Sequence, residues 1–217
     1  LDALARPYFQ LLRDLARAGA DEDRTASRHE WFRGLLEALG LPWSPRDYES
    51  QEGVTIHILS EVARAGGRPE LWILETASAD DEPADPLSLP LAGGPEEPAD
   101  EVITRLVFGA PEPPRWVLLL DAHQVLLLDR TKWSQKRLLR FDLSEIFGRR
   151  SKETLKAVAA LLHRDSLCPD DGVSLLDTLD ESSHKHAFAV SEDLKDSVRE
   201  AVELLGNEAV YYVEWVL

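Results

Sequence analysis

Two carboxylates close apolar runs in the first half of the chain, where a strand would leave a hydrophobic core. Glu61 lies at the end of the run that begins at Val54, and Glu75 ends the run that begins at Leu71. Acidic groups on adjacent strands can together bind Mg²⁺, which activates a water for attack. We therefore consider Glu61 and Glu75 candidate catalytic residues and metal ligands of a nuclease.

The order of elements is compatible with a restriction-endonuclease core, in which a lysine two residues after the second acid helps to orient the attacking water. That lysine is missing here. The triplet at the second acid is Glu75-Thr76-Ala77, so no cation stands two residues after the carboxylate. Without it, a hydroxide nucleophile loses a stabilising partner. The simpler alternative is that both acids are ordinary strand-end carboxylates.

A histidine pair is the second arrangement that suggests chemistry. His184 and His186 have the H-x-H spacing with which two imidazoles can reach one metal ion. Possible further ligands upstream are His163, Cys168 and Asp170, but the alternative is that the pair makes only hydrogen bonds. The sequence contains no Gly-x-Ser-x-Gly elbow, P-loop or dinucleotide-binding glycine motif, which argues against those classes of enzyme.

A basic segment is the third candidate. Seven of its side chains are the predicted nucleic-acid contacts: Arg130, Lys132, Lys136, Arg137, Arg140, Arg149 and Arg150. They could contact phosphates while Trp133 and Phe141 anchor the segment in the core. The alternative is an amphipathic surface element without a ligand.

Charge is segregated along the chain. The net charge of −16 opposes binding to nucleic acid. Residues 70–101 contain ten acidic and no basic residues, whereas residues 130–164 contain ten Lys or Arg and three acidic residues. A local basic surface is therefore compatible with an acidic chain.

The elements that must position these groups centre on residues 115–130, RWVLLLDAHQVLLLDR. Two apolar runs, residues 116–120 and 125–128, flank a short polar insert, which predicts a β-hairpin. Both runs are continuously apolar, so we expect helices to cover both faces. Asp129 and Arg130 end the second strand and are the first polar groups of a possible site.

The remaining elements complete a predicted α/β domain. We expect helices over 2–19, over 27–39 with Ser27 as N-cap, over 101–108, and after a cap at Ser151. Strands are expected over 54–62 and 71–75, and an acidic, poorly ordered loop over 77–100. This order predicts a mixed sheet of four or more strands flanked by helices, with a restriction-endonuclease-like core. The domain should span 1–165, and 166–217 should form a helical extension.

Composition limits the setting. One cysteine excludes an internal disulfide, and no apolar run is long enough to span a bilayer, so we expect a cytoplasmic protein without a membrane partner. The chain begins at Leu1, lacks Met and ends in the apolar AVYYVEWVL. We therefore expect it to be part of a larger protein.

Several long segments resemble a known family. The quoted runs are RWVLLLDAHQVLLLDRTKWSQKRLLRFDLSEIFGRR, TLKAVAALLHRDSLCPDDGVSLLDTLDESSHKHAFAVSEDLK and REAVELLGNEAVYY. They resemble the N-terminal region of large bacterial DNA adenine methyltransferases of the type IIG restriction-modification sort, including methylases of DISARM-like phage-defence systems. The resemblance extends from residue 71 to the end of the sequence. It is spread over these long segments and does not rest on a short catalytic motif.

The resemblance implies a module of a DNA-modifying protein. In this family the region precedes the methyltransferase core, and in type IIG enzymes it often holds the nuclease. The chain contains no Asn-Pro-Pro-Tyr or Asp-Pro-Pro-Tyr tetrapeptide and no S-adenosylmethionine glycine motif, so S-adenosylmethionine would belong to a downstream region. The missing lysine implies that the nuclease-like fold is degenerate.

Three hypotheses follow. The first is an accessory domain that contacts DNA next to a downstream methyltransferase region and needs no cofactor itself. The second is a Mg²⁺-dependent endonuclease that uses Glu61 and Glu75. The third is a protein-interaction domain of a phage-defence complex, which docks on defence-system proteins.

Overall fold

The computed structural model describes residues 1–64, 67–77, 83–183, 185, 195 and 198. The chain divides into two compact units, Leu1–Ser174 and Leu175–Leu217. The first unit contains all the named helices and strands. The metal-ligand prediction for His184 and His186 lies outside the described residues.

A five-stranded mixed sheet forms the centre of the first unit, in the order β3-β4-β5-β6-β7. β4 and β5 are parallel, and the other neighbouring strands are antiparallel. A separate antiparallel pair is made by β1 and β2. The strands are β1 Arg46–Glu49, β2 Thr55–Ile58, β3 Ser60–Ala63, β4 Pro69–Glu75, β5 Trp116–Leu120, β6 Gln124–Asp129 and β7 Leu138–Asp142. The predicted mixed α/β architecture is confirmed.

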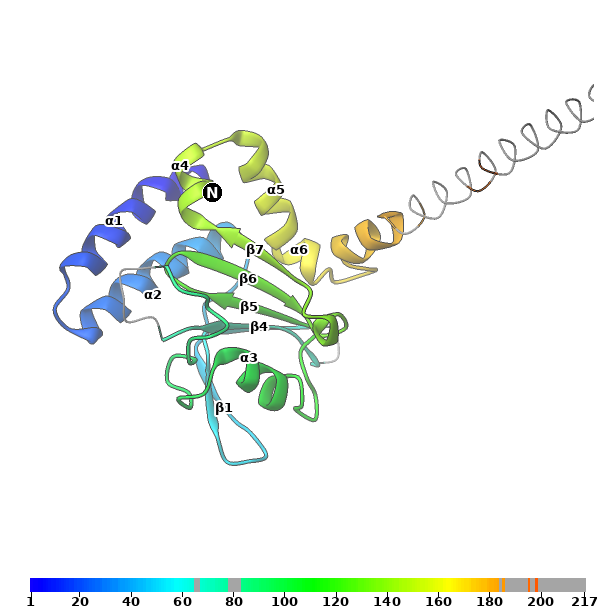
Figure 1. Cartoon of the computed structure of the whole chain (residues 1–217), viewed down its shortest axis with the longest axis horizontal. Coiled ribbons are helices and arrows are strands. Elements are labelled where there is room, and N and C mark those ends of the chain that lie inside the picture. The colour runs from blue at the N-terminus through cyan, green and yellow to red at the C-terminus, as the bar shows by residue number, and fades with distance from the viewer. Residues whose placement is uncertain (65–66, 78–82, 184, 186–194, 196–197, 199–217) are drawn as a thin grey trace, which may run out of the picture. The chain divides into compact units, whose positions relative to one another are not determined.

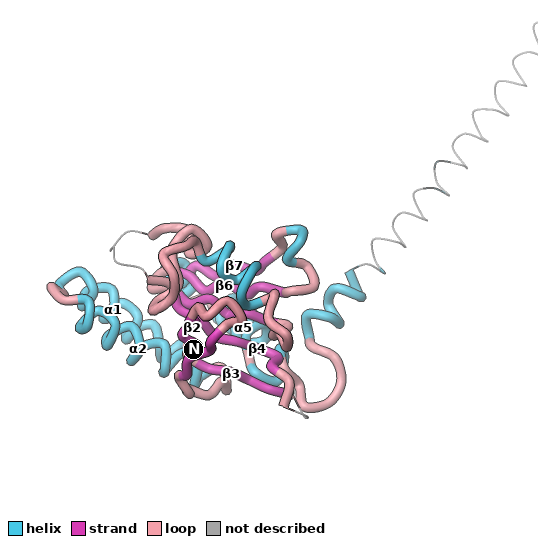
Figure 2. Tube along the Cα trace, turned by 90° about the horizontal axis from the view of Figure 1, so that it is seen from below, coloured by secondary structure: helices cyan, strands magenta, loops and turns pink. Residues whose placement is uncertain are grey.

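Helices surround these strands. In both views α1 and α2 lie side by side as a helical hairpin (Figures 1 and 2). The α-helices are α1 Ala5–Arg17, α2 Asp21–Ala38, α3 Ala99–Val102, α4 Leu143–Arg149, α5 Lys152–Leu162 and α6 Arg164–Leu167. The other helical turns are the 3-10 helices η1 Asp2–Leu4 and η3 Trp133–Gln135 and the π-helix η2 Ile103–Val107.

Both faces of the central strands are covered, as their continuous apolar runs predicted. One face packs against α3 and η2; its sheet residues are Trp72, Leu74, Val117, Leu119, Leu126 and Leu128. On β4 the alternate residues, Ile73 and Glu75 among them, point to the other face. There α2 reaches Glu75 through two side chains, and α4 contacts β6. The predicted hairpin of residues 116–128 is the β5-β6 pair.

One predicted strand is in fact two. The run over 54–62 divides at the buried Leu59, where the chain leaves the small sheet and enters the large one. β2 pairs with β1, whereas β3 pairs with β4. The alternating pattern detected extended backbone but could not identify the partner strand, because partners are set by contacts distant in sequence.

Two other local predictions are corrected. The second helix begins at Asp21, so Ser27 is not its N-cap. Asp21, Glu22 and Asp23 occupy the first turn, where carboxylates interact favourably with the positive end of the helix dipole. The basic segment also contains a strand, β7, that its mixed polar composition did not indicate.

The boundary between the units falls after Ser174, nine residues beyond the predicted end of the domain at 165. Residues 175–183 are helical. None of the described helices is both long enough and apolar enough to cross a membrane.

Candidate functional site

The carboxyl ends of β4 and β5 bring two buried acids to one edge of the sheet. Glu75 is the last residue of β4, and Asp121 directly follows β5. Thr76 connects the two strand ends: its amide donates to the Leu120 carbonyl at 3.0 Å, and its Oγ1 donates to Asp121 Oδ2 at 3.2 Å. Ligands of open α/β sheets commonly bind outside the carboxyl ends of parallel strands. This edge is therefore the first candidate location for a functional site.

Glu75 is already neutralised there by α2. Its carboxylate is 3% exposed, with Oε1 2.6 Å from Arg28 Nε and Oε2 2.7 Å from His29 Nε2. Both oxygens are therefore engaged by nitrogen groups of the protein. A Mg²⁺ ion would have to displace them, and an arginine remains protonated and cannot serve as a general base. The residues present do not fit a metal site.

Asp121 has a structural role in the hairpin turn. Its Oδ1 accepts a hydrogen bond from the His123 amide at 2.9 Å, and its Oδ2 accepts the bond from Thr76. These contacts hold the turn between β5 and β6 and the end of β4 together. They satisfy a carboxylate that is almost completely buried.

The second predicted acid lies elsewhere. Glu61 of β3 is opposite Trp72 of β4. On β4, Trp72 lies three residues before Glu75. Residues an odd number of positions apart on a strand point to opposite faces, so the two carboxylates do not converge. Glu61 instead pairs with Arg46 and accepts a hydrogen bond from Trp72 Nε1 at 2.6 Å. A catalytic role for Glu61 and Glu75 together gains no support from this geometry.

Other candidate ligands are not assembled either. In the part of the chain that is described, no three His, Cys, Asp or Glu side chains are placed to hold a metal ion. Cys168 is buried, and burial raises the pKa of its thiol to about 12. The lone cysteine is therefore protonated at neutral pH and unsuited to act as a nucleophile.

The predicted basic residues lie before β7, on β7 and after it. Arg130, Lys132, Lys136 and Arg137 belong to the connection between β6 and β7. Arg140 is on β7 itself, whereas Arg149 and Arg150 are at the end of α4. The structure thus brings five of the seven onto one strand connection and the strand that follows it. We name residues 130–140 the basic connection.

Two buried aromatic side chains anchor the basic connection, as expected from the sequence. Trp133 is 5% exposed, and its Nε1 donates to Thr104 Oγ1 of η2 at 2.8 Å. Lys136 Nζ lies 4.3 Å from the centroid of the Trp133 ring, and Phe141 of β7 is buried. The connection is therefore held against the core while most of its cationic side chains remain at the surface.

Several of these cations already have partners. Arg140 Nη2 lies 2.9 Å from Asp85 Oδ1, and Lys136 Nζ lies 3.4 Å from Asp100 Oδ2. Arg130 Nε donates to the Pro114 carbonyl at 3.2 Å. In the α4 group, Arg149 pairs with Glu145 and Arg150 with Asp2.

Arg137 differs from these residues. It is exposed, and no side chain of the described residues makes an ion pair or hydrogen bond with its guanidinium. It therefore offers the clearest unengaged cation of the basic connection.

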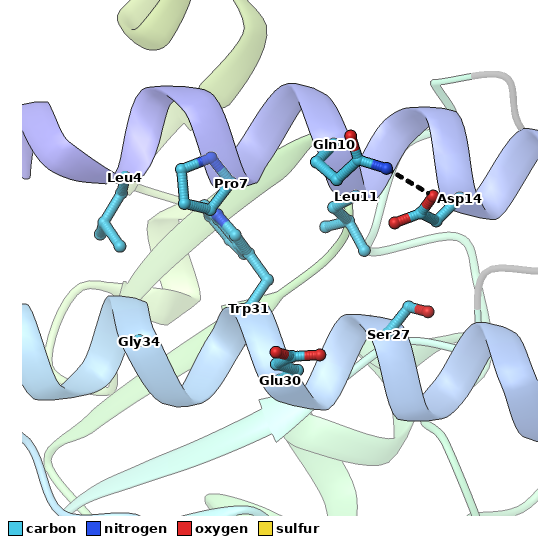
Figure 3. A pocket seen from close by; sticks show the side chains of 9 residues that line it. All are labelled: Leu4, Pro7, Gln10, Leu11, Asp14, Ser27, Glu30, Trp31 and Gly34. Atoms are coloured by element: carbon cyan, nitrogen blue, oxygen red, sulfur yellow. Dashed lines mark hydrogen bonds between the residues drawn. The ribbon is translucent and has the colours of Figure 1, made fainter.

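A pocket between α1 and α2 has the wrong charge for phosphate. It has a volume of about 310 Å³, and Figure 3 shows Trp31 rising from α2 towards Pro7 of α1. Asp14 and Glu30 line it, and none of its lining residues is cationic. Gln10 Nε2 donates to Asp14 Oδ1 at 2.7 Å, so part of this polarity is satisfied internally.

The Arg28, His29 and Glu75 cluster was not found from the sequence. One signal was available: Arg28 lies on the same helical stripe as Trp31, Phe32 and Leu35, all of which are buried. A charged residue within an apolar stripe needs a buried partner. The identity of that partner depends on the packing of α2 against β4 and cannot be read from local spacing.

Comparisons with known proteins add little to this picture. No family model matches the chain, and no curated protein matches it. A search of solved structures matched a chain from a cryo-EM structure of a DrdV–DNA complex, with 15% sequence identity and a TM-score of 0.43. The match covers 75% of this chain and 14% of that chain. A similarity this weak establishes neither a family nor a function.

Proposed function

We propose that this chain is a DNA-contacting module whose basic connection holds the phosphate backbone of duplex DNA. The observation that carries the proposal is the anchoring of this short, exposed, cation-rich segment by the buried Trp133 and Phe141. An arginine on an anchored backbone binds phosphate with less loss of conformational freedom than one on a mobile tail. Arg130, Arg137 and Arg140 are the contacts that we expect to contribute most.

The contacts belong to the class that positions a protein on DNA. Arginine and lysine bind phosphate oxygens irrespective of sequence, and their binding weakens with salt because counterions are released. The basic connection is a short turn followed by an edge strand, and we assign no base reading to it. The chain's net charge of −16 further implies weak affinity that depends on local attraction.

The wider setting is part of the proposal. The sequence resemblance supports an accessory domain of a DNA adenine methyltransferase from a restriction-modification or phage-defence system. S-adenosylmethionine would bind a downstream region, and defence-system proteins are further candidate partners. We do not assign Mg²⁺-dependent cleavage to Glu61 and Glu75. Arg28 and His29 already bind both carboxylate oxygens of Glu75, and the two acids point to opposite faces of the sheet.

Fluorescence anisotropy with a labelled duplex tests the proposal. We expect Arg137→Glu to weaken binding and to reduce the slope of log K against log salt by about one. Arg17→Glu, an exposed change at the far end of α1, alters the net charge equally and should leave both quantities nearly unchanged.

Equal effects of the two variants would show that only net charge matters and would contradict a binding role for the basic connection. Absence of binding in the unmodified chain and in every variant, even at low salt, would favour the protein-interaction hypothesis.

A further inference from the structure

The acidic segment that leads from β4 into the first turn of α3 lies against the basic connection. We name residues 83–100 the acidic strap. Its Asp85 pairs with Arg140, and its Asp100 pairs with Lys136. The two oppositely charged regions of the sequence thus meet in the folded chain, and they meet at two of the predicted DNA contacts.

Both contacts lie on the same side of the sheet. Arg140 is opposite Leu126 in the β6-β7 register, and Leu126 belongs to the core under α3 and η2. Lys136 covers the ring of Trp133, which belongs to the same core. The strap therefore places two carboxylates along one surface of the basic connection.

Backbone contacts hold the middle of the strap in place. Leu91 is 2% exposed and bridges to Thr76, and the amides of Ala77 and Ala92 donate to Pro90 and Glu75. The strap is therefore attached to the end of β4. Its carboxylates are kept beside the cations at a high effective concentration.

The ion pairs themselves can be exchanged readily. The side chains of Arg140 and Asp85 are 41% and 52% exposed, and those of Lys136 and Asp100 are 60% and 36% exposed. Exposed pairs of this kind contribute little to stability. A phosphate can displace either carboxylate through rotation of side chains, without movement of the anchored backbone.

We propose that the acidic strap is a built-in competitor for DNA, which occupies the phosphate positions on Arg140 and Lys136 in the free chain. This inference rests on the proposed function and concerns the regulation of the same site. It implies that the chain binds DNA only when several phosphates act together to replace the carboxylates, so isolated phosphate groups are rejected.

The test uses the full chain and a labelled duplex. The double variant Asp85→Asn/Asp100→Asn removes both competing charges with little change in shape. Its matched control is Glu37→Gln/Glu49→Gln, which makes the same change in net charge at two exposed positions outside the basic connection and the strap. Each protein is titrated with duplex at several salt concentrations.

We expect the strap variant to bind roughly three- to ten-fold more tightly than the unmodified chain at low salt. Its slope of log K against log salt should be steeper by about two, because two more cations become free to release counterions from DNA. The control should change neither quantity by a comparable amount. Tighter binding together with this change of slope would support the proposal that the acidic strap competes with DNA.

The two proposals can fail separately. Equal affinity and equal salt dependence of the strap variant and its control would overturn the proposal that the strap competes with DNA, whatever the result for Arg137→Glu. Weaker binding by Arg137→Glu in the same series would then leave DNA contact by the basic connection standing. Absence of binding by every protein, the strap variant included, would overturn the proposed function itself.

Discussion

At the scale of single residues, Arg28 and Glu75 form a buried ion pair that ties α2 to the end of β4. The two side chains are almost completely buried, and their charged atoms are 2.6 Å apart. A buried pair need not stabilise a fold more than apolar residues would, but the loss of one partner leaves an uncompensated charge. The same pairing prevents Glu75 from acting as a free metal ligand.

We expect Arg28→Met to lower the free energy of unfolding by about 3 kcal/mol, since Glu75 would retain only His29. Urea denaturation followed by circular dichroism measures this change. The exposed substitution Arg13→Met serves as control and should cost less than about 0.5 kcal/mol. If the double variant Arg28→Met/Glu75→Leu recovers none of the loss, the cost lies in packing and not in the unpaired charge.

At the scale of elements, two short helices near the basic connection depend on their caps. Asp142 Oδ1 accepts a hydrogen bond from the Glu145 amide at 2.9 Å at the start of α4. Ser151 Oγ accepts one from the Thr154 amide at 3.3 Å at the start of α5, so the predicted cap at Ser151 is confirmed. Ser27 lies within α2 and caps nothing.

Alanine substitutions should separate these cases. Asp142→Ala and Ser151→Ala should each lower the free energy of unfolding by about 1 kcal/mol through loss of a cap. Ser27→Ala should be neutral or stabilising by up to about 0.5 kcal/mol, because alanine has the higher helix propensity. Thermal and urea denaturation of the three variants provide the comparison. A cost for Ser27→Ala equal to that for Ser151→Ala would indicate that the helix begins at Ser27.

At the scale of the whole molecule, the extent of the first unit decides what can fold alone. α6 contributes Leu167, which is completely buried, and Cys168 directly after it is 3% exposed. Both lie beyond the boundary at 165 that composition suggested, and Ser174, also buried, is the last residue of the unit.

A chain that ends at Ser174 should therefore unfold in one cooperative transition with urea. A chain that ends at Asp165 should be less stable by about 2 to 5 kcal/mol, because it lacks a fully buried leucine and its neighbour. Comparing the two truncated chains by urea denaturation tests the boundary directly. Equal stability of the two would move the boundary back to 165.

The sequence by itself determined the central hairpin, the covering of both its faces, the anchoring role of Trp133 and Phe141, and the segregation of charge. These features follow from local composition and periodicity, which are properties of short stretches of chain. Only the tertiary structure decided which charges meet. The register of β3 on β4 separates Glu61 from Glu75, and the packing of α2 brings Arg28 and His29 to Glu75.

The same distinction applies to the candidate interface. Sequence showed an acidic segment and a basic one but not that Asp85 and Asp100 would lie on Arg140 and Lys136. Arg140 and Asp85 are 55 residues apart in the sequence, and Lys136 and Asp100 are 36 residues apart. They meet because the buried strands between them fold into one sheet, and the burial of those strands determines where polar side chains reach the surface. Charge composition is a property of the chain, whereas charge pairing is a property of its packing.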